Sequence, residues 1–386
     1  MDYNEIKKEV FSYENYLIGI KNHLHTHAEV GFDLTDTYQF VFECLKAIGY
    51  FPRKCGKKGI IAELNNECKE TILFRADMDA LPIKDESNST YKSDINMHAC
   101  GHDLHTTFLL GAAKFLFNKK NKLKINVRFA FQPAEEILEG AQDMINDNLL
   151  KDINYAVMIH VLVKSKLDVG SFVIAKPGII APSCDYFDFE FIGKSVHGAL
   201  PSLGIDPINV SNEFMNIING LLTRNYRNIT MTYGAINGGG VYNVIPDKVS
   251  LKGTLRTFYD DLRVEFKSDI ANIASNLSKI YKCTINSFYK TSVPCFKQDL
   301  ELYEKIYSIV NKLDNYVHIS ETNIKDGAGS EDFALVSQKV KTVMINICAG
   351  KESDGFVYPL HNSKVIFDDN VLKEGVSLLS FIALNL

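Results

Sequence analysis

Apolar side chains along this chain follow two alternating patterns, one typical of helices and the other typical of strands. An apolar side chain recurs every three or four positions between Ile6 and Leu24, which predicts an amphipathic helix. The same spacing predicts further helices over 36–48, 102–117 and 136–150. Runs rich in β-branched and aromatic residues predict buried strands over 59–64, 71–74, 125–131 and 155–159. This alternation predicts an α/β fold with helices on both faces of its sheet.

The pattern breaks near Pro177 and Pro182, and a different order of elements follows. From 183 to 292 the spacing predicts a strand, a helix, two strands, a second helix and a last strand. A unit of this length has an ordinary domain size. Helix–strand alternation then returns. We therefore expect a mixed-sheet α/β domain formed by 1–182 and 293–386, interrupted by an inserted α+β domain over 183–292.

Composition and charge argue against several classes of partner. Of the 386 residues 46% are hydrophobic, and the net charge of -5 leaves no basic surplus to neutralise nucleic-acid phosphates. No run of about 18 apolar residues suggests a membrane span, and the polar residues 1–10 do not look like a signal peptide. The eight cysteines are scattered without a C-x-x-C pair. We expect reduced thiols, a cytoplasmic location, and neither a nucleic-acid nor a membrane partner.

Ionisable residues gather after the predicted strands, where open α/β sheets place their sites. Asp77 and Asp79 follow the strand over 71–74, although two such residues are equally typical of a turn. Cys100 and His102 open a helix two positions apart, so a thiolate and an imidazole can reach one metal centre. The alternative is a polar helix cap. A cysteine with three histidines inside 97–105 is hard to explain as core, which favours a metal site.

A carboxylate pair and two separate histidines complete the candidate chemistry. Glu135 and Glu136 are predicted to lie in the first turn of a helix and to point in different directions, so that one can bind a metal while the other handles a proton. Alone, the pair is more typical of negative charge favoured by the helix dipole, and His160 and His361 are each more typical of structural histidines. Together the candidates offer the mixed donors that two divalent ions need: Cys100, His102, Glu136, His160 and His361.

In the order of these motifs, the chain resembles the amidohydrolase branch of the M20 peptidase family. That branch includes aminoacylases, hippurate hydrolases, auxin-conjugate hydrolases and N-acetyldiaminopimelate deacetylases. The resemblance spans nearly the whole chain, through segments 24–32, 75–82, 97–105, 131–136, 193–201, 243–246, 253–258, 329–333 and 360–361. Ala28 and Leu34 depart from the family's pattern, but both lie away from the candidate ligands.

The resemblance implies a catalytic role for the α/β domain. It implies that two divalent ions are bound, with Cys100 shared between them, by Cys100, His102, Glu136, His160 and His361. Manganese or zinc is the expected metal, with cobalt or nickel as alternatives. It also implies that Glu135 is the general base, which takes a proton from a water bridging the ions and returns it to the departing nitrogen.

The inserted domain resembles the family's lid and dimerisation domain. The resemblance implies that His197 reaches the site of the partner subunit in a homodimer and stabilises the oxyanion. It also implies that Asn243 and Arg256 hold the substrate's amide oxygen or carboxylate. An arginine suits a carboxylate because its donors match it in a bidentate way. A surface or strand ion pair is the alternative for Arg256.

The expected activity is therefore hydrolysis of the amide bond of small-molecule N-acyl amino acids, which releases a carboxylic acid and a free amino acid. Two alternatives stay open: a dipeptidase or aminopeptidase of the same family, and a non-catalytic binding protein on the same scaffold. The Cys100-x-His102 pair favours the acylase, because the dipeptidase branches carry His-x-Asp. A non-catalytic protein is expected to lack Glu135 or a ligand, and here each is present.

Overall fold

The computed structural model of the chain describes residues 1–318 and 329–386, which divide into two units. Unit 1 comprises 1–180, 297–318 and 332–386, and unit 2 comprises 181–296 and 329–331. Each unit has its own cluster of buried apolar side chains. The mixed α/β fold class predicted from the sequence is confirmed. The catalytic and lid roles given to the two parts of the chain stay predictions.

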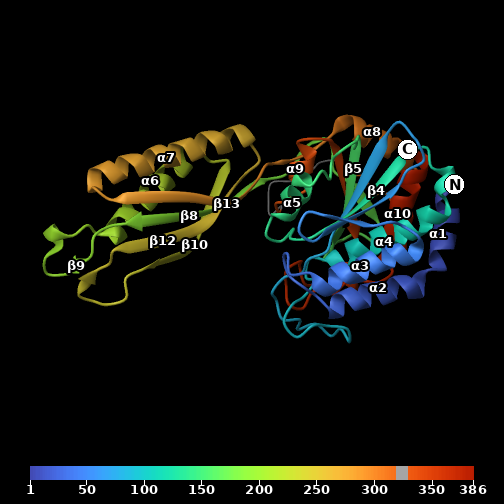
Figure 1. Cartoon of the computed structure of the whole chain (residues 1–386), viewed down its shortest axis with the longest axis horizontal. Helices are drawn as coiled ribbons and strands as arrows, with labels where there is room; N and C mark the ends of the chain where they lie inside the picture. Colours follow the sequence, from blue (N-terminus) through green and yellow to red (C-terminus); the bar gives the residue numbers. More distant parts are fainter. Residues whose placement is uncertain (319–328) are drawn as a thin grey trace. The chain divides into compact units, whose positions relative to one another are not determined.

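Unit 1 is built on a seven-stranded mixed sheet with the order β1-β2-β4-β3-β5-β15-β6 (Figure 1). Strands β4, β3, β5 and β15 run parallel, whereas β1, β2 and β6 are antiparallel to their neighbours. The strands are β1 Arg53–Cys55, β2 Gly59–Leu64, β3 Thr71–Asp77, β4 Asn126–Gln132, β5 Tyr155–Leu162, β6 Phe172–Ile174 and β15 Lys341–Cys348. The parallel strands are largely buried, which explains their continuous apolar runs.

Helices pack on this sheet, and both chain termini lie on unit 1 (Figure 1). Helices α4 and α10 pack against each other and the sheet, and α1, α2 and α3 pack onto them. Helices α5, α8 and α9 contact the sheet at β4 and β15. The helices are α1 Tyr3–Phe11, α2 Glu14–Thr26, α3 Thr35–Ile48, α4 His102–Asn118, α5 Gly140–Asn146, α8 Leu300–Val310, α9 Ala334–Ser337 and α10 Val371–Asn385.

Two predicted helices differ from the observed ones. The apolar spacing between Ile6 and Leu24 runs through two helices, because the chain turns after α1 at Ser12, whose hydroxyl donates to the carbonyl of Glu9 at 2.6 Å. The helix predicted over 136–150 is reduced to α5. Ala134 and Leu138 both have φ of 57°, in the left-handed region, so the chain makes a turn before α5 begins. The carboxylate pair therefore lies on that turn, and its prediction as the first turn of a helix was wrong.

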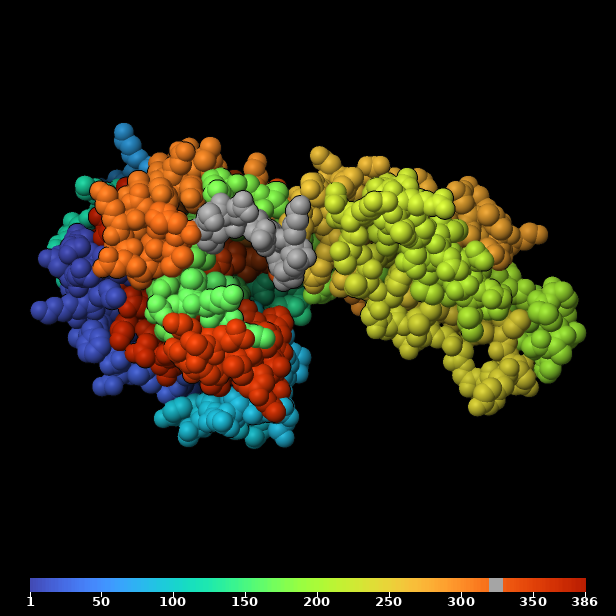
Figure 2. Space-filling model, turned by 180° about the vertical axis from the view of Figure 1, so that it is seen from behind, coloured from blue at the N-terminus to red at the C-terminus, as the bar shows by residue number. Residues whose placement is uncertain are grey.

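The parallel neighbours β5 and β15 bring two distant parts of the chain to one edge of the sheet. The chain that leaves β5 meets the chain that leaves β15 at an isolated bridge between Ser165 and Lys351. These two segments form adjoining surface in Figure 2, in green and red. Because parallel strands end at the same edge, His160 on β5 and the loop after β15 that carries His361 reach the same region.

Unit 2 is a four-stranded antiparallel sheet, ordered β10-β12-β8-β13, with α6 and α7 on one face (Figure 1). Phe187, Phe189 and Phe191 alternate along β8 and are buried against these helices. The first and last strands of the unit are neighbours, with Cys184 paired to Val293. The elements are β8 Ser183–Ile192, β10 Ile229–Gly238, β12 Lys248–Thr257, β13 Thr284–Val293, α6 Pro207–Arg224 and α7 Asp260–Tyr281.

Two small ribbons accompany the main sheets. Strands β9 (Val196–His197) and β11 (Val244–Ile245) pair with each other, as do β7 (Gly178–Ala181) and β14 (Phe296–Gln298). All eight cysteines are free thiols. Within residues 1–318 and 329–386, no helix combines the length and the apolar character that crossing a membrane requires.

Candidate metal centre

A tight turn at the start of α4 carries two of the predicted ligands, Cys100 and His102. Between them, Gly101 has φ of 84°, which favours glycine. A Cβ at Gly101 would lie 2.5 Å from Cγ2 of Val161, so a larger residue would also have to displace β5. The turn directs both ligand side chains into the interior of unit 1, where they are 7% and 1% exposed.

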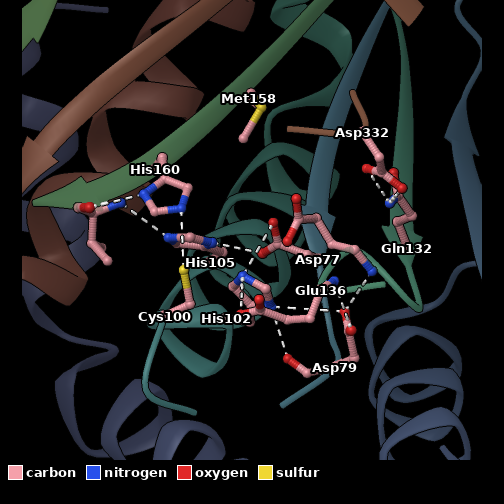
Figure 3. A network of polar contacts seen from close by, with 12 residues as sticks. Asp77, Asp79, Cys100, His102, His105, Gln132, Glu136, Met158, His160 and Asp332 are labelled. Atoms are coloured by element: carbon pink, nitrogen blue, oxygen red, sulfur yellow. Dashed lines mark hydrogen bonds and ion pairs between the residues drawn. The ribbon is translucent and has the colours of Figure 1, made fainter. Parts of the chain in front are cut away.

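His102 is oriented by the backbone that follows β3. Its Nδ1 donates to the carbonyl oxygen of Asp79 at 2.7 Å (Figure 3). The lone pair of Nε2 is therefore available to a metal ion. Nε2 is buried and has no hydrogen-bond partner in the part of the chain that the structure describes. Burial alone lowers the pKa of His102, but the Asp77 carboxylate, 3.7 Å from Nε2, raises it well above the usual value. The surroundings therefore favour positive charge at Nε2, which a metal ion would supply.

Cys100 lies between two further histidines. Its Sγ is 3.6 Å from Nε2 of His160 and 3.3 Å from Nε2 of His361. Burial raises the pKa of the Cys100 thiol above its usual range. A coordinating cation deprotonates a thiol outright and so overcomes this effect. The sulfur is therefore central to the donor set and is chemically suited to a metal.

His160 and His361 reach that sulfur from different elements. Nδ1 of His160 donates to the carbonyl of Val161 at 2.9 Å, so Nε2 is left facing Cys100. Burial lowers the pKa of His160 to about 3, which keeps the imidazole neutral. The backbone N–H of His361 donates to the carbonyl of Ala99 at 2.9 Å, and its φ is 64°. A left-handed residue other than glycine costs about 1–3 kcal/mol, and such strain is concentrated at functional sites.

A single carboxylate holds the turn that carries the glutamate pair. Asp79 accepts from the N–H of Glu135 at 2.9 Å through Oδ1 and from the N–H of Glu136 at 3.1 Å through Oδ2. Oε1 of Glu136 lies 3.8 Å from Nε2 of His102 and 3.6 Å from Nε2 of His361. Glu136 therefore faces both imidazoles, and Glu135, 6% exposed, lies beside it.

The five predicted ligands meet in overlapping groups of donors. Within each group, the donor atoms lie within 4.8 Å of one another. The groups are Cys100, His102 and His160; Cys100, Glu136 and His361; and His102, Glu135 and Glu136. Thiolate, imidazole and carboxylate donors in these numbers suit divalent ions such as zinc or manganese. The residues present therefore fit a metal centre.

A buried network of charges lies behind these ligands. Asp77 accepts from Nδ1 of His105 at 2.6 Å (Figure 3). It also accepts from Nη1 of Arg75 at 2.6 Å. Nη2 of Arg75 donates in turn to Asp332 at 2.9 Å. Burial alone raises the pKa of Asp77, but His102 and Arg75 lower it well below the usual value. Asp77 therefore remains a carboxylate beside the ligands.

A second buried network fixes the start of α4. His25 on α2 is 2.7 Å from Oδ2 of Asp103 and 3.2 Å from Oδ2 of Asp85. Burial alone lowers the pKa of His25, but the hydrogen bonds to Asp103 and Asp85 raise it to about 9. A charged His25 thus joins α2, α4 and the loop that carries Asp85.

The other predicted site residues lie in unit 2, where His197 and Asn243 are neighbours. His197 on β9 pairs with Val244 on β11, and Gly198 N–H donates to the carbonyl of Asn243 at 2.7 Å. Both His197 and Asn243 are exposed. Nδ1 of His197 accepts from the N–H of Ala199 at 3.1 Å, which places the proton of a neutral imidazole on Nε2. His197 can therefore donate a hydrogen bond outward.

Arg256, the remaining predicted site residue, is half-buried on β12. Its Nη1 donates to the hydroxyl of Ser330 at 2.8 Å. Ser330 belongs to the motif over 329–333, so two distant motifs meet within unit 2.

No role was predicted from the sequence for the groups that orient the predicted ligands. Asp77, Asp79 and His105 stand in the motifs over 75–82 and 97–105. The available signal was position: His105 follows His102 by three residues, so both lie on one face of α4. His25 and Asp85 gave no such signal, because they meet α4 only through the fold.

Comparison with known proteins gives the family. The family model described as Peptidase family M20/M25/M40 matches residues 73–385. The N-acetyl-L-cysteine deacetylase of Bacillus subtilis (strain 168) is 34% identical over 334 residues, which is 85% of this chain and 79% of the relative. Thermostable carboxypeptidase 2 of Saccharolobus solfataricus is 30% identical over 391 residues, 98% of each protein. The hippurate hydrolase of Campylobacter jejuni is 30% identical over 388 residues, 97% of this chain and 98% of the relative.

The fold agrees with these matches. A solved dinuclear metal-binding peptidase of the M20 family from Bacillus subtilis has a TM-score of 0.78 against this chain at 27% identity, covering 97% of this chain and 98% of the other. The family match extends from β3 through α10 and so includes all the predicted ligands. On this evidence the chain belongs to the peptidase family M20/M25/M40.

Proposed function

We propose that this chain is a two-metal hydrolase that cleaves the amide bond of N-acyl amino acids, releasing a carboxylic acid and a free amino acid. One observation carries the proposal. Five donors from distant parts of the sequence converge, with a further carboxylate, Glu135, in reach of two of them. The relatives named for deacetylation of N-acetyl-L-cysteine and hydrolysis of hippurate support the choice of substrate class.

The donors would hold two divalent ions, with Sγ of Cys100 shared between them: Cys100, His102, Glu136, His160 and His361. Manganese or zinc is the proposed metal, because one thiolate is combined with three imidazoles and a carboxylate. When bound, such ions polarise the acyl carbonyl and lower the pKa of an attacking water.

Glu135 would act as the general base. The turn held by Asp79 places it beside Glu136, which faces His102 and His361. The ligand role therefore falls to Glu136, and the proton-transfer role falls to Glu135. Its carboxylate would accept a proton as the water attacks and deliver that proton to the departing nitrogen.

Unit 2 would bind the polar ends of the substrate. Nε2–H of His197 is a donor for the oxygen that becomes negatively charged during attack. Nη1 of Arg256 donates to Ser330, and its Nε and Nη2 could bind the substrate carboxylate with two parallel hydrogen bonds. The Asn243 side chain is exposed beside His197 and can donate to the amide oxygen.

A homodimer would complete this arrangement. Exposed apolar side chains surround the β9–β11 ribbon that carries His197: Leu200, Leu203, Val241, Tyr242 and Val244. Such patches mark protein interfaces more often than free surface. A second copy of the chain is the proposed partner, with His197 of each subunit serving the metal centre of the other.

The second candidate is a carboxypeptidase. The carboxypeptidase 2 of Saccharolobus solfataricus matches 98% of this chain. An N-acyl amino acid and the end of a peptide share an amide next to a free carboxylate, so the same residues would bind either. The acyl side of the amide is what differs between them.

The test is a panel of substrates assayed with metal-free protein to which single metals are returned. N-acetyl, N-benzoyl and longer N-acyl amino acids are compared with dipeptides and tripeptides of the same C-terminal residue. We expect the highest kcat/KM on N-acyl amino acids, with manganese or zinc, and two ions bound per chain. Preference for peptides would favour the second candidate, and no turnover with any metal would refute both.

A further inference from the structure

His105 is a buried histidine beside the metal centre that has no place in the proposed ligand set. It is 2% exposed and lies one helical turn after His102 on α4. Its ring centroid is 4.7 Å from that of His160, with the planes inclined by 60° (Figure 3). A polar ring in this position needs an explanation, because burying it without partners costs free energy.

Both ring nitrogens of His105 are engaged, one as a donor and the other as an acceptor. Nδ1 is 2.6 Å from Oδ1 of Asp77, a carboxylate that can only accept. Nε2 accepts from the backbone N–H of Val161 at 3.0 Å. The ring is therefore in the tautomer with its proton on Nδ1. Neither nitrogen has a lone pair left for a metal, although His105 lies close enough to Asp77 and His102 to be considered a ligand.

Val161 is the residue through which His105 acts on the centre. Its N–H is held by His105, and its carbonyl accepts from Nδ1 of His160 at 2.9 Å. The His105 imidazole thus holds the backbone of Val161, and the backbone of Val161 in turn holds the imidazole of His160. A shift of Val161 would break the bond to Nδ1 of His160 and release the ring that faces Cys100 across 3.6 Å.

We propose that His105 is a positioning residue that sets the tautomer and direction of His160 through the backbone of Val161. Asp77 anchors the chain of contacts, because its Oδ1 accepts from His105 while its Oδ2 accepts from Arg75. One carboxylate therefore supports His160 through His105 and lies 3.7 Å from His102 directly. The inference rests on the proposed function only in requiring that His160 bind an ion.

Three variants of His105 separate this role from simple filling of the core. His105→Leu keeps the bulk and removes both hydrogen bonds. His105→Asn can donate to Asp77 but is too short to reach Val161, whereas His105→Gln is long enough to accept from Val161. Phe115→Leu is the matched control, since Phe115 is a fully buried residue further along the same helix.

The measurement is the affinity of each protein for Co²⁺, followed by the visible absorption of the bound ion and the thiolate-to-metal charge-transfer band of Cys100. Nitrogen NMR of labelled histidine reports the tautomer of His160 in parallel. Groups that orient a ligand imidazole typically contribute about 10- to 100-fold to metal affinity. We expect His105→Leu and His105→Asn to lose that factor for one of the two ions, and His105→Gln to recover most of it. Phe115→Leu should lose thermal stability and keep both affinities.

The outcomes distinguish this inference from the proposed function. A wild-type protein that binds two ions, with unchanged affinities in a folded His105→Leu variant, would overturn the role of His105 alone. A wild-type protein that binds no ion would overturn both proposals. If the leucine variant does not fold, equal affinities in the asparagine and glutamine variants would count against the role, because only glutamine can reach Val161.

Discussion

The candidate metal centre of unit 1 and the β9–β11 ribbon of unit 2 would contribute different parts of the proposed chemistry, and they are built in opposite ways. In unit 1 the imidazoles of His102 and His160 are each fixed by a hydrogen bond from Nδ1 to a backbone carbonyl. In unit 2 His197 and Asn243 stand exposed on a two-stranded ribbon. The imidazoles of the first site are thus oriented by the backbone of their own chain. The second requires a substrate and, in our proposal, a second subunit to become complete.

The largest effect is expected from removing the proposed general base of unit 1 while leaving the predicted metal ligands in place. Glu135→Gln should lower kcat by about 100- to 10,000-fold, the usual contribution of a general base, because the amide cannot accept the proton of water. Bound metal, measured by elemental analysis, should stay at the wild-type level. Glu139→Gln, an exposed neighbour on the same segment, should have normal kcat. Near-normal turnover in Glu135→Gln would remove the base assignment.

The corresponding change in unit 2 should affect rate without affecting metal or stability. His197→Ala should lower kcat by about 100- to 1,000-fold, the range for losing one oxyanion donor. Its melting temperature should not move, since the side chain is exposed. Mixing His197→Ala with Glu135→Gln should restore activity, because one site in each mixed dimer then has both residues. Absence of any recovery would show that His197 does not serve the other subunit.

Unit 2 should nevertheless have a rigid interior, and its charge cluster is the place to test this. Asp185 is fully buried and accepts from Nε and Nη2 of Arg263 at 2.7 and 2.9 Å. Asp185→Asn should destabilise the protein by about 3 kcal/mol, the lower end for a broken buried pair, because Arg263 can turn to solvent. Urea unfolding measures this. Asp188→Asn, at a partly exposed ion pair on the same strand, should cost less than about 1 kcal/mol.

The same cluster predicts an acid-sensitive component of stability. Burial alone raises the pKa of Asp185, but hydrogen bonds from Arg263 and Ser292 lower it below the usual value. A lowered pKa in the folded state stabilises above the unfolded value of about 4, and the effect is lost as the pH falls below it. The stability difference between wild type and Asp185→Asn should therefore shrink as the pH falls from 5 to 3. A difference that stays constant over this range would contradict the assignment.

In unit 1 His25 should make the folded state less stable as the pH rises, which is the opposite of the effect of Asp185. Its pKa is raised to about 9 from 6.5, so its contribution is complete below pH 6.5 and is lost as the pH rises through about 9. The shift from 6.5 to about 9 corresponds to a contribution of about 3 kcal/mol. Wild type should therefore lose stability between pH 7 and pH 9.5 relative to His25→Gln, as followed by urea midpoints. Parallel curves for the two proteins would mean that His25 is not charged in the folded state.

The contrast between the two regions also separates what the sequence could predict from what it could not. Cys100 and His102 were predicted as ligands because a thiolate and an imidazole two positions apart can reach one metal centre. The strands carrying Asp77 and His160 followed from their apolar runs, since parallel strands buried on both faces leave a strong signal. Unit 2 gave an equally clear pattern along β8, where buried phenylalanines alternate with polar residues.

The failures have physical causes of their own. The turn around Glu135 was taken for a helix because its residues favour helices, whereas the carboxylate of Asp79, more than fifty positions earlier, draws both glutamate N–H groups into a turn. His105 was recognised as part of a motif but not as a positioning residue, because its partners Asp77 and Val161 lie on strands β3 and β5, far from it in the sequence. A stretch of sequence indicates only its own preference for helix, strand or turn, whereas these contacts form between segments that the folded sheet brings together.

The pairing of Cys184 with Val293 has a consequence for how the protein folds. Strands β5 and β15 must pair across the whole inserted unit, and contacts between such distant segments are slow to form. When β8 and β13 have paired, the two ends of the insertion are adjacent, and the loop that the β5–β15 pairing must close is effectively shortened. We therefore expect unit 2 to fold early and to speed the assembly of unit 1. The insertion would then act as a kinetic aid to the assembly of the candidate metal centre.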